Sequence, residues 1–174
     1  MRIIFILGAD RCGKSTLCQK FIENGWKYRH FSAPKSSPYG EYRDFVMNEL
    51  PAVDGVPGII VDRFMYCEFP YSVHYGRKSD MTFGRMLGLE AHIKRLDPDT
   101  KLIYCETDLD SNWRRIQDEG KSEFKTKDEL AKLRKEYERV LETTSIPVLR
   151  YDFTLGDTPE HMFKRICATG KART

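Results

Sequence analysis

Residues 8 to 16, Gly-Ala-Asp-Arg-Cys-Gly-Lys-Ser-Thr, have the types and the spacing of a loop that binds phosphate groups. They fit the pattern of a glycine, four spacer residues, a second glycine, a lysine and a hydroxyl residue. In such a loop the backbone N–H groups surround the phosphates, the lysine reaches the β- and γ-phosphates of ATP, and the hydroxyl binds Mg²⁺. We therefore predict that ATP binds these nine residues, with Lys14 catalytic and Ser15 a magnesium ligand: Gly8, Ala9, Asp10, Arg11, Cys12, Gly13, Lys14, Ser15 and Thr16.

A carboxylate and a guanidinium end a second apolar run, Gly-Ile-Ile-Val-Asp-Arg-Phe, at positions 58 to 64. Behind a phosphate loop, an aspartate at the end of a buried strand is the position that holds the Mg²⁺ shell. Asp62 is therefore predicted as a catalytic and metal-binding residue. Arg63, which follows at once, has two interpretations: a surface ion pair, or a two-pronged clamp on the phosphate of an acceptor.

The elements that must position these residues alternate along the chain. Short apolar runs predict strands, and apolar residues at helical spacing predict helices between them. Thr126 and Glu129 form a capping box at the start of one helix, and Thr158 with Pro159 opens the last. This order predicts an α/β fold of the P-loop NTPase type, with three layers, a parallel sheet and a short lid segment. The strands are expected at 2–7, 27–31, 58–61, 101–106 and 146–151, helices at 14–24, 41–50, 81–96 and 110–119, and a loop at 32–40.

Length and composition limit the alternatives. A chain of 174 residues is expected to form a single domain, 1–174, and 40% hydrophobic residues suit an ordinary core. A net charge of +3 suits an anionic partner but is too small to argue for nucleic-acid binding. No apolar run is long enough to cross a membrane, and the N-terminus has the pattern of a strand rather than of a signal peptide. Five scattered cysteines predict reduced thiols in a cytoplasmic protein.

With these features in hand, the chain resembles the thymidylate kinases, within the nucleoside monophosphate kinase group. The matching segments occur in the family's order and reach over most of the chain. They are "GADRCGKST" (8–16), "FSAPKSSPYG" (31–40), "IIVDRFMYCEFPY" (59–71) and "RRIQDEGKSEF" (114–124). The resemblance implies ATP and Mg²⁺ as cofactors and a small-molecule nucleotide as the acceptor.

The resemblance also implies roles for individual residues. Asp10 would meet the 3′-hydroxyl of the acceptor's sugar, and Arg11 would stabilise the phosphoryl group in transfer, as a built-in arginine finger. The alternative is that Asp10 and Arg11 pair with each other across the loop. The family's acceptor-binding positions match Phe31, Lys35 and Tyr71, although Lys35 is equally open to interpretation as a solvated loop lysine. The family's lid arginines, which can add transition-state charge, match Arg114 and Arg115.

Glu68 is open to three interpretations. Its carboxylate is a candidate general base, a candidate for the outer Mg²⁺ shell, or an exposed glutamate that starts a helix. We retain it among the substrate-binding candidates.

One departure from the family concerns the acceptor base. In thymidylate kinases a longer, mostly helical stretch separates the glycine matching Gly40 from the aspartate matching Asp62. That stretch carries the residues that stack on thymine and read its edge. Here only residues 41–61 lie between Gly40 and Asp62, and neither base-reading residue can be placed. Most of the rings in residues 64–75 are expected to pack in the core, and one or two of them could supply the stacking, since an aromatic ring stacks on any base.

The sequence therefore predicts phosphoryl transfer from ATP to a deoxynucleoside monophosphate. The rival is a kinase that acts on a hydroxyl, either of a deoxynucleoside or of a hydroxymethylated base in DNA, with Glu68 or Asp62 as the base. A nucleotide-binding switch is disfavoured because it gains little from Arg11. The four histidines are expected to be structural, and a homodimer remains open.

Overall fold

The structure is a computed structural model that describes residues 1–32, 38–120 and 124–168. Its centre is one sheet of five parallel strands, in the order β2-β3-β1-β4-β5. The strands are β1 (Arg2–Leu7), β2 (Lys27–His30), β3 (Gly58–Asp62), β4 (Lys101–Cys105) and β5 (Val148–Tyr151). All five lie within a residue or two of the runs predicted from the sequence.

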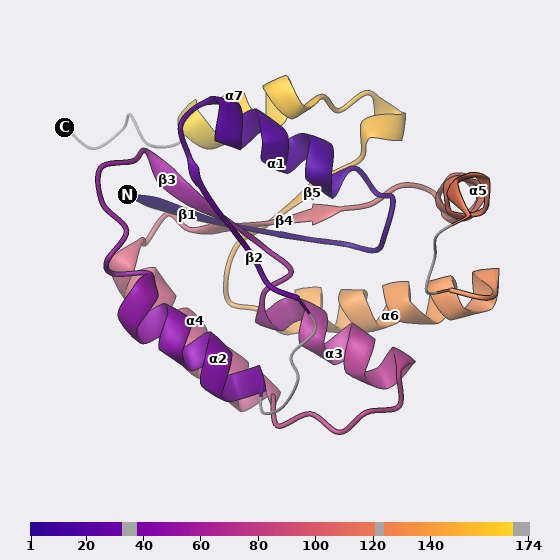
Figure 1. Ribbon diagram of the computed structural model, residues 1–174, viewed down its shortest axis with the longest axis horizontal. Helices are drawn as coiled ribbons and strands as arrows, with labels where there is room; N and C mark the ends of the chain where they lie inside the picture. The colour runs from indigo at the N-terminus through magenta and orange to yellow at the C-terminus, as the bar shows by residue number, and fades with distance from the viewer. Residues whose placement is uncertain (33–37, 121–123, 169–174) are drawn as a thin grey trace.

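Helices cover both faces of the sheet, which makes three layers (Figure 1). Helices α1 (Lys14–Glu23) and α7 (Pro159–Ala168) lie on one face. The other face carries α2 (Pro38–Asp44), α3 (Met65–His74), α4 (Phe83–Leu96) and α6 (Lys127–Thr143), while α5 (Leu109–Glu119) lies beyond one end of the strands. The predicted α/β architecture is confirmed.

The central strand, β1, contributes side chains to both hydrophobic clusters of the core, one on each face of the sheet. Ile3, Phe5 and Leu7 point into the larger cluster, under α2, α3, α4 and α6, whereas Ile4 and Ile6 point into the smaller one, under α1 and α7. Successive side chains of a strand face opposite sides, so a strand buried on both faces must be apolar throughout. This explains the unbroken apolar run at residues 3–7 that predicted β1.

The strand order locates the site. From β1 the chain first builds β2 and β3 on one side and then crosses to β4 and β5 on the other. In open parallel sheets a ligand crevice forms at the carboxyl ends of the strands where this reversal occurs. The phosphate loop leaves β1 at that point, and Ile6 of β1 is in register with Asp62 of β3.

Two helical segments differ from the prediction. The loop expected at 32–40 ends early, because α2 begins at Pro38, a residue whose fixed φ suits the first helical position. The helix expected at 41–50 instead ends as α2 at Asp44 and continues as a π-helical segment, Phe45–Glu49. There Leu50 donates its N–H to the carbonyl of Phe45, at 2.8 Å. Residues 33–37 of the expected loop lie outside the described residues.

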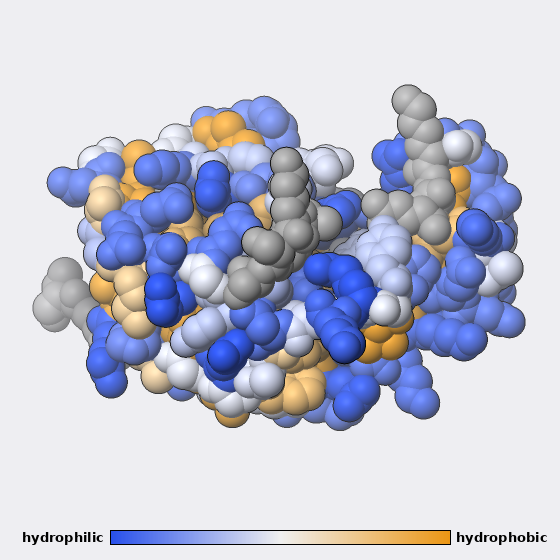
Figure 2. Space-filling view, turned by 60° about the horizontal axis from the view of Figure 1, so that its bottom comes forward, coloured by the Kyte–Doolittle hydropathy of each residue, from blue (hydrophilic) through white to orange (hydrophobic). Residues whose placement is uncertain are grey.

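Two further sequence expectations concern the surface and the cysteines. Within the described ranges, no helix has the length and apolarity needed to cross a membrane. Figure 2 shows the face formed by the helices below the sheet, where hydrophilic side chains predominate and hydrophobic ones are scattered. All five cysteines are free thiols: Cys12, Cys18, Cys67, Cys105 and Cys167.

Candidate active site

The phosphate loop requires its two glycines. Gly8 has φ +140°, and a Cβ there would lie 2.2 Å from the carbonyl oxygen of Cys105. Gly13 has φ +86°, and a Cβ there would lie 2.9 Å from the ring of Phe153. Only glycine adopts such backbone angles without strain and lets the backbone approach so closely. The loop is therefore held tightly between β4 and the segment that follows β5.

Lys14 lies in the middle of this loop and is buried, with 7% of its surface exposed. Its Nζ donates to the carbonyl oxygens of Gly8, at 2.9 Å, and Ala9, at 2.5 Å. The thiol of Cys12 donates to the same Ala9 carbonyl, and burial raises the pKa of that thiol. The ammonium group is thus fixed inside the curve of the loop, where a phosphate held by the loop's N–H groups would meet it.

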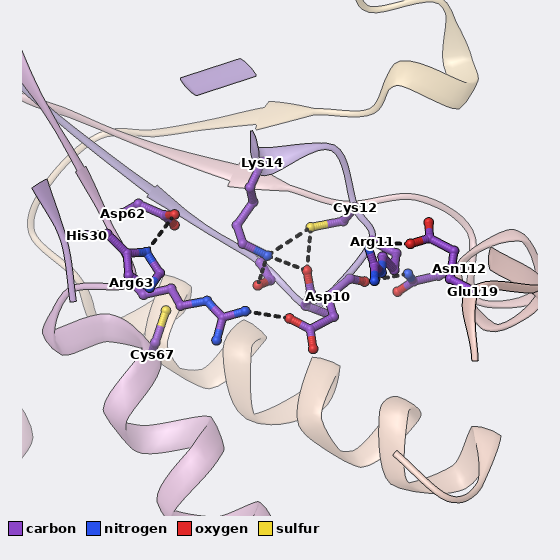
Figure 3. Close-up of polar contacts among 12 residues, drawn as sticks. Asp10, Arg11, Cys12, Lys14, His30, Asp62, Arg63, Cys67, Asn112 and Glu119 are labelled. Atoms are coloured by element: carbon purple, nitrogen blue, oxygen red, sulfur yellow. Dashed lines mark hydrogen bonds and ion pairs between the residues drawn. The ribbon is translucent and has the colours of Figure 1, made fainter. Parts of the chain in front are cut away.

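Asp10 and Arg63 form an ion pair, with 2.6 Å between Oδ1 and the guanidinium (Figure 3). The Arg63 guanidinium also lies 5.9 Å from the centre of the Tyr71 ring on α3. Arg63 has φ +55°, a strained angle for a residue with a side chain, and such strain is concentrated at functional sites. The alternative in which Asp10 pairs with Arg11 is wrong, because the structure pairs Asp10 with Arg63.

Arg11 reaches in the other direction. Its guanidinium lies 2.5 Å from the carboxylate of Glu119, at the end of α5, and its backbone too has a positive φ, +63°. The side-chain amide of Asn112, also on α5, donates to the carbonyl of Asp10 at 2.8 Å. Helix α5 is therefore tied to the phosphate loop at two points (Figure 3).

Asp62 is 5% exposed, and two residues of β2 hold its carboxylate. The Tyr28 hydroxyl and the His30 Nδ1 both lie 3.0 Å from Oδ2, while the buried Oδ1 has no hydrogen-bond partner among the described residues. The His30 interaction is drawn in Figure 3. Burial and the negative charge of Asp62 raise the pKa of the Tyr28 phenol, so Tyr28 is a fixed donor.

Tyr28 and His30 are site residues that the sequence prediction missed, since it took the histidines as structural. The signal was present. Two residues apart on one strand, they share a face, and the parallel register places His30 opposite Asp62. Knowing that β2 lies beside β3, rather than beside β1, was the missing step.

One cavity of about 740 Å³ contains most of the predicted phosphate-binding residues. It is lined from the loop by Asp10, Arg11, Gly13, Lys14, Ser15 and Thr16, and from elsewhere by Tyr28, His30, Asp62, Arg63, Arg115 and Glu119. This volume lies in the range of sites that bind small molecules. Mg²⁺ takes oxygen ligands, and the unpaired Oδ1 of Asp62 and the exposed Ser15 hydroxyl fit that requirement.

Other predicted site residues lie elsewhere. Phe31 is 2% exposed and packs among the rings of Tyr42, Phe45 and Phe64, so it supports the site from the core and does not line the cavity. Lys35 lies outside the described residues. Tyr71 is buried, and its ring lies beneath Arg63.

Glu68 corrects a prediction. It is not an exposed helix-start residue, because it is 2% exposed and its Oε2 pairs with Arg77 at 2.8 Å. The fold encloses this carboxylate between α3 and neighbouring elements, and Arg77, in the turn after α3, offsets part of its charge. The sequence contained no motif that pointed to Arg77.

The two lid arginines lie in different places. Arg115 lines the main cavity and stacks on Phe153, with 4.2 Å between its guanidinium and the ring centre. Arg114 lines a neighbouring cavity of about 500 Å³, together with Arg115, Ser111 and Thr154. Residues 121–123 of the predicted lid lie outside the described residues.

Comparisons with known proteins agree with this geometry. No family model matches the chain. A thymidylate kinase of Leptospira interrogans is 28% identical over 178 residues, which cover 83% of this chain and 85% of that protein. Over most of its length the chain is similar to a thymidylate kinase.

Solved structures extend the likeness to the fold. The YorR protein of Bacillus subtilis, solved with phosphorylated GDP, has a TM-score of 0.76 at 19% identity, over 96% of this chain and 94% of that one. A deoxyadenosine kinase from M. mycoides has a TM-score of 0.54 at 19% identity, over 97% and 98%. The chain has the P-loop kinase fold of these structures, and its similarity to the thymidylate kinase indicates a nucleotide kinase, a phosphotransferase.

Proposed function

We propose that the chain is an ATP- and Mg²⁺-dependent kinase that transfers the γ-phosphoryl group to the phosphate of a deoxynucleoside monophosphate. One observation carries this proposal: a single cavity holds a phosphate loop with Lys14 on one side and the Asp10–Arg63 pair on the other. A second cation across from the loop is what an anionic acceptor requires. We also propose that residues 1–174 act as one domain, and that the free thiols belong to a cytoplasmic protein.

The donor half of the reaction would be carried by the loop. Its N–H groups would hold the ATP phosphates, and the Lys14 ammonium would neutralise charge on the β- and γ-phosphates. Arg11 would leave Glu119 and turn to the phosphoryl group in transfer, where a guanidinium stabilises the transition state. Arg115, already stacked on Phe153, offers a second cation on the same side.

Ser15 and Asp62 would hold Mg²⁺, whose charge would neutralise the β- and γ-phosphate oxygens. Tyr28 and His30 would fix the Asp62 carboxylate by occupying Oδ2, which leaves Oδ1 for the metal or its water. Such outer partners orient a ligand and tune its affinity.

On the acceptor side, Arg63 would bind the acceptor phosphate and Asp10 the 3′-hydroxyl of its sugar. The two side chains now satisfy each other at 2.6 Å, so the cavity keeps both charges compensated before the acceptor arrives. An acceptor phosphate is itself an anionic nucleophile and needs no strong base. This agrees with a cavity in which Asp10 is paired with Arg63 and Glu119 with Arg11.

The test is ADP release measured across deoxynucleoside monophosphates, deoxynucleosides and DNA oligomers carrying hydroxymethylated bases. We expect turnover with monophosphates and its loss in Lys14→Ala, with Lys20→Ala, on the outer side of α1, as the matched control. Turnover only on nucleosides or on DNA would overturn the proposal.

One observation favours the second candidate, a kinase that acts on a hydroxyl. A hydroxyl acceptor needs a base, and His30 presents its imidazole to the main cavity with Nδ1 on Asp62. Glu68, the base considered from the sequence, is ion-paired and does not line this cavity. The acceptor panel separates the two candidates directly.

A further inference from the structure

Glu68 carries a buried charge that the proposed reaction does not use. Its side chain is 1% exposed, and Oε2 accepts a hydrogen bond from Arg77 at 2.8 Å. The other oxygen, Oε1, is buried and has no hydrogen-bond partner in the part of the chain that the structure describes. A buried carboxylate oxygen without a partner is costly, and such an atom in a native site calls for an explanation.

The position of Glu68 relates it to the acceptor side of the main cavity. Glu68 and Tyr71 are three residues apart on α3, so their side chains are neighbours on one face of the helix. Tyr71 in turn lies beneath the Arg63 guanidinium, at 5.9 Å. Glu68 is therefore about one helical turn from Tyr71, the ring over which the Arg63 guanidinium lies.

Helix α2 packs against α3, the helix that carries Glu68. Burial and the charge of Glu68 raise the pKa of the Tyr42 phenol, which agrees with a carboxylate between α2 and α3. Arg77 is 27% exposed, so its guanidinium is the edge of this pair that solvent reaches. The Glu68–Arg77 pair thus offers one hydrogen-bond acceptor without a partner, Oε1 of Glu68, beside the N–H donors of the Arg77 guanidinium.

We propose that Glu68, with Arg77, determines the base specificity of the acceptor and selects a base that carries an amino group over thymine. The proposal rests on the function proposed above. Guanine, adenine and cytosine each present an exocyclic amino group that could donate to Oε1, and each has an acceptor nearby for Arg77.

Thymine does not fit this arrangement. Its one N–H lies between two carbonyl oxygens, which would face the negative carboxylate. A site with a buried polar atom rejects a ligand that leaves the atom unpaired. A hydrogen bond to a charged group corresponds to a preference of about 10- to 100-fold.

The experiment compares kcat/KM for dGMP, dAMP, dCMP and dTMP in the parent protein and in Glu68→Gln. We expect at least one amino-bearing monophosphate to exceed dTMP by at least about tenfold in the parent. Glu68→Gln keeps the size but removes the charge and adds an N–H donor, so this ratio should collapse towards one. Glu41→Gln, an exposed carboxylate on α2, is the matched control and should leave the ratio unchanged.

A purely structural role for the Glu68–Arg77 pair would lower the melting temperature of Glu68→Gln but leave the ratio between bases unchanged, and that result would overturn the proposal. So would a preference of the parent for dTMP. Calorimetric binding of the monophosphates, with deoxyribose 5-phosphate as a ligand without a base, measures the same ratio without turnover. Deoxyribose 5-phosphate should bind the parent and Glu68→Gln equally.

Failure of the proposed function would look different. No monophosphate would then release ADP, and the ratio would be measured with the four deoxynucleosides instead. An unchanged ratio there also overturns the role of Glu68, whereas a collapsed ratio upholds it for a hydroxyl acceptor.

Discussion

Arg11 is paired with a carboxylate in the structure, although its proposed role is to bind the phosphoryl group in transfer. It is held by Glu119 at 2.5 Å, yet it lies in the loop where the γ-phosphate of ATP would bind. We expect Arg11→Ala to lower kcat by about 10³-fold, as for other arginine fingers, with little change in the KM for ATP. Steady-state kinetics check this, with Arg139→Ala, an exposed arginine on α6, as the control. An unchanged kcat would mean that Arg11 serves only to tie the loop to α5.

Tyr28 provides a test of how Asp62 is positioned. Tyr28→Phe removes one of the two hydrogen bonds on Oδ2 while it keeps the ring, so the carboxylate becomes free to rotate. We expect the Mg²⁺ concentration for half-maximal activity to rise by about tenfold, because outer partners of metal ligands typically have effects of this size. A Mg²⁺ titration of activity checks it, and the KM for the acceptor should stay the same. An unchanged Mg²⁺ requirement would contradict the role given to Asp62.

Among individual site residues, the sequence identified those that belong to a contiguous motif and missed those that are brought to the site by pairing across the fold. Gly8, Lys14 and Asp62 follow from contiguous patterns, and all three lie at one end of the sheet. His30 and Arg77 meet their carboxylates across 32 and 9 residues of chain, through the strand order and the turn after α3. No local pattern carries that information.

Among the elements, strand and helix periodicity was sufficient to predict all five strands and most of the helices that cover them. One exception is α3, Met65–His74, which has Pro70 inside it and was not predicted. The other is the segment that ends at Leu50, where the helix turns from α to π. Its wider turn lets Phe45 and Val46 both reach the core next to Phe31. That outcome depends on packing against β3 and α4, so the pattern of the segment alone could not predict it.

Gly8 links an element to the site and yields a stability prediction. In Gly8→Ala the new Cβ would meet the Cys105 carbonyl at 2.2 Å, and neither atom can move without distorting β1 or β4. We expect a loss of more than about 3 kcal/mol in the free energy of unfolding, from the strain and the clash together.

The control for Gly8→Ala is Gly88→Ala, because Gly88 lies within α4 with no atom within 4 Å of a built Cβ. Alanine there should stabilise the protein by about 0.5–1 kcal/mol. Denaturant unfolding measures both variants. Equal stability of the two would contradict the tight junction described between the loop and β4.

For the molecule as a whole, the reversal of strand order beside β1 brings the loop, β3 and α5 around one cavity. The sequence similarity to the thymidylate kinase of Leptospira interrogans extends over 83% of the chain, well beyond the loop motif. The short stretch between α2 and β3 is where the residues expected to read thymine could not be placed from the sequence. Helix α2, which precedes this stretch, contacts α3, the helix of Glu68, which is proposed with Arg77 to select a different base.

A ligand that joins donor and acceptor tests the cavity as one unit. Such a ligand is an adenosine joined to a deoxynucleoside through a chain of phosphates. It should bind tightest when the number of phosphates equals the three of ATP, plus those of the acceptor, plus one that spans the gap crossed in transfer. A monophosphate acceptor therefore predicts that a pentaphosphate link is best, and a hydroxyl acceptor predicts a tetraphosphate. Because the second half binds as part of the same molecule, we expect the better link to exceed a non-hydrolysable ATP analogue by at least about 100-fold in affinity. Calorimetry with both links gives the answer, and tighter binding of the tetraphosphate would favour the hydroxyl acceptor and His30 as its base.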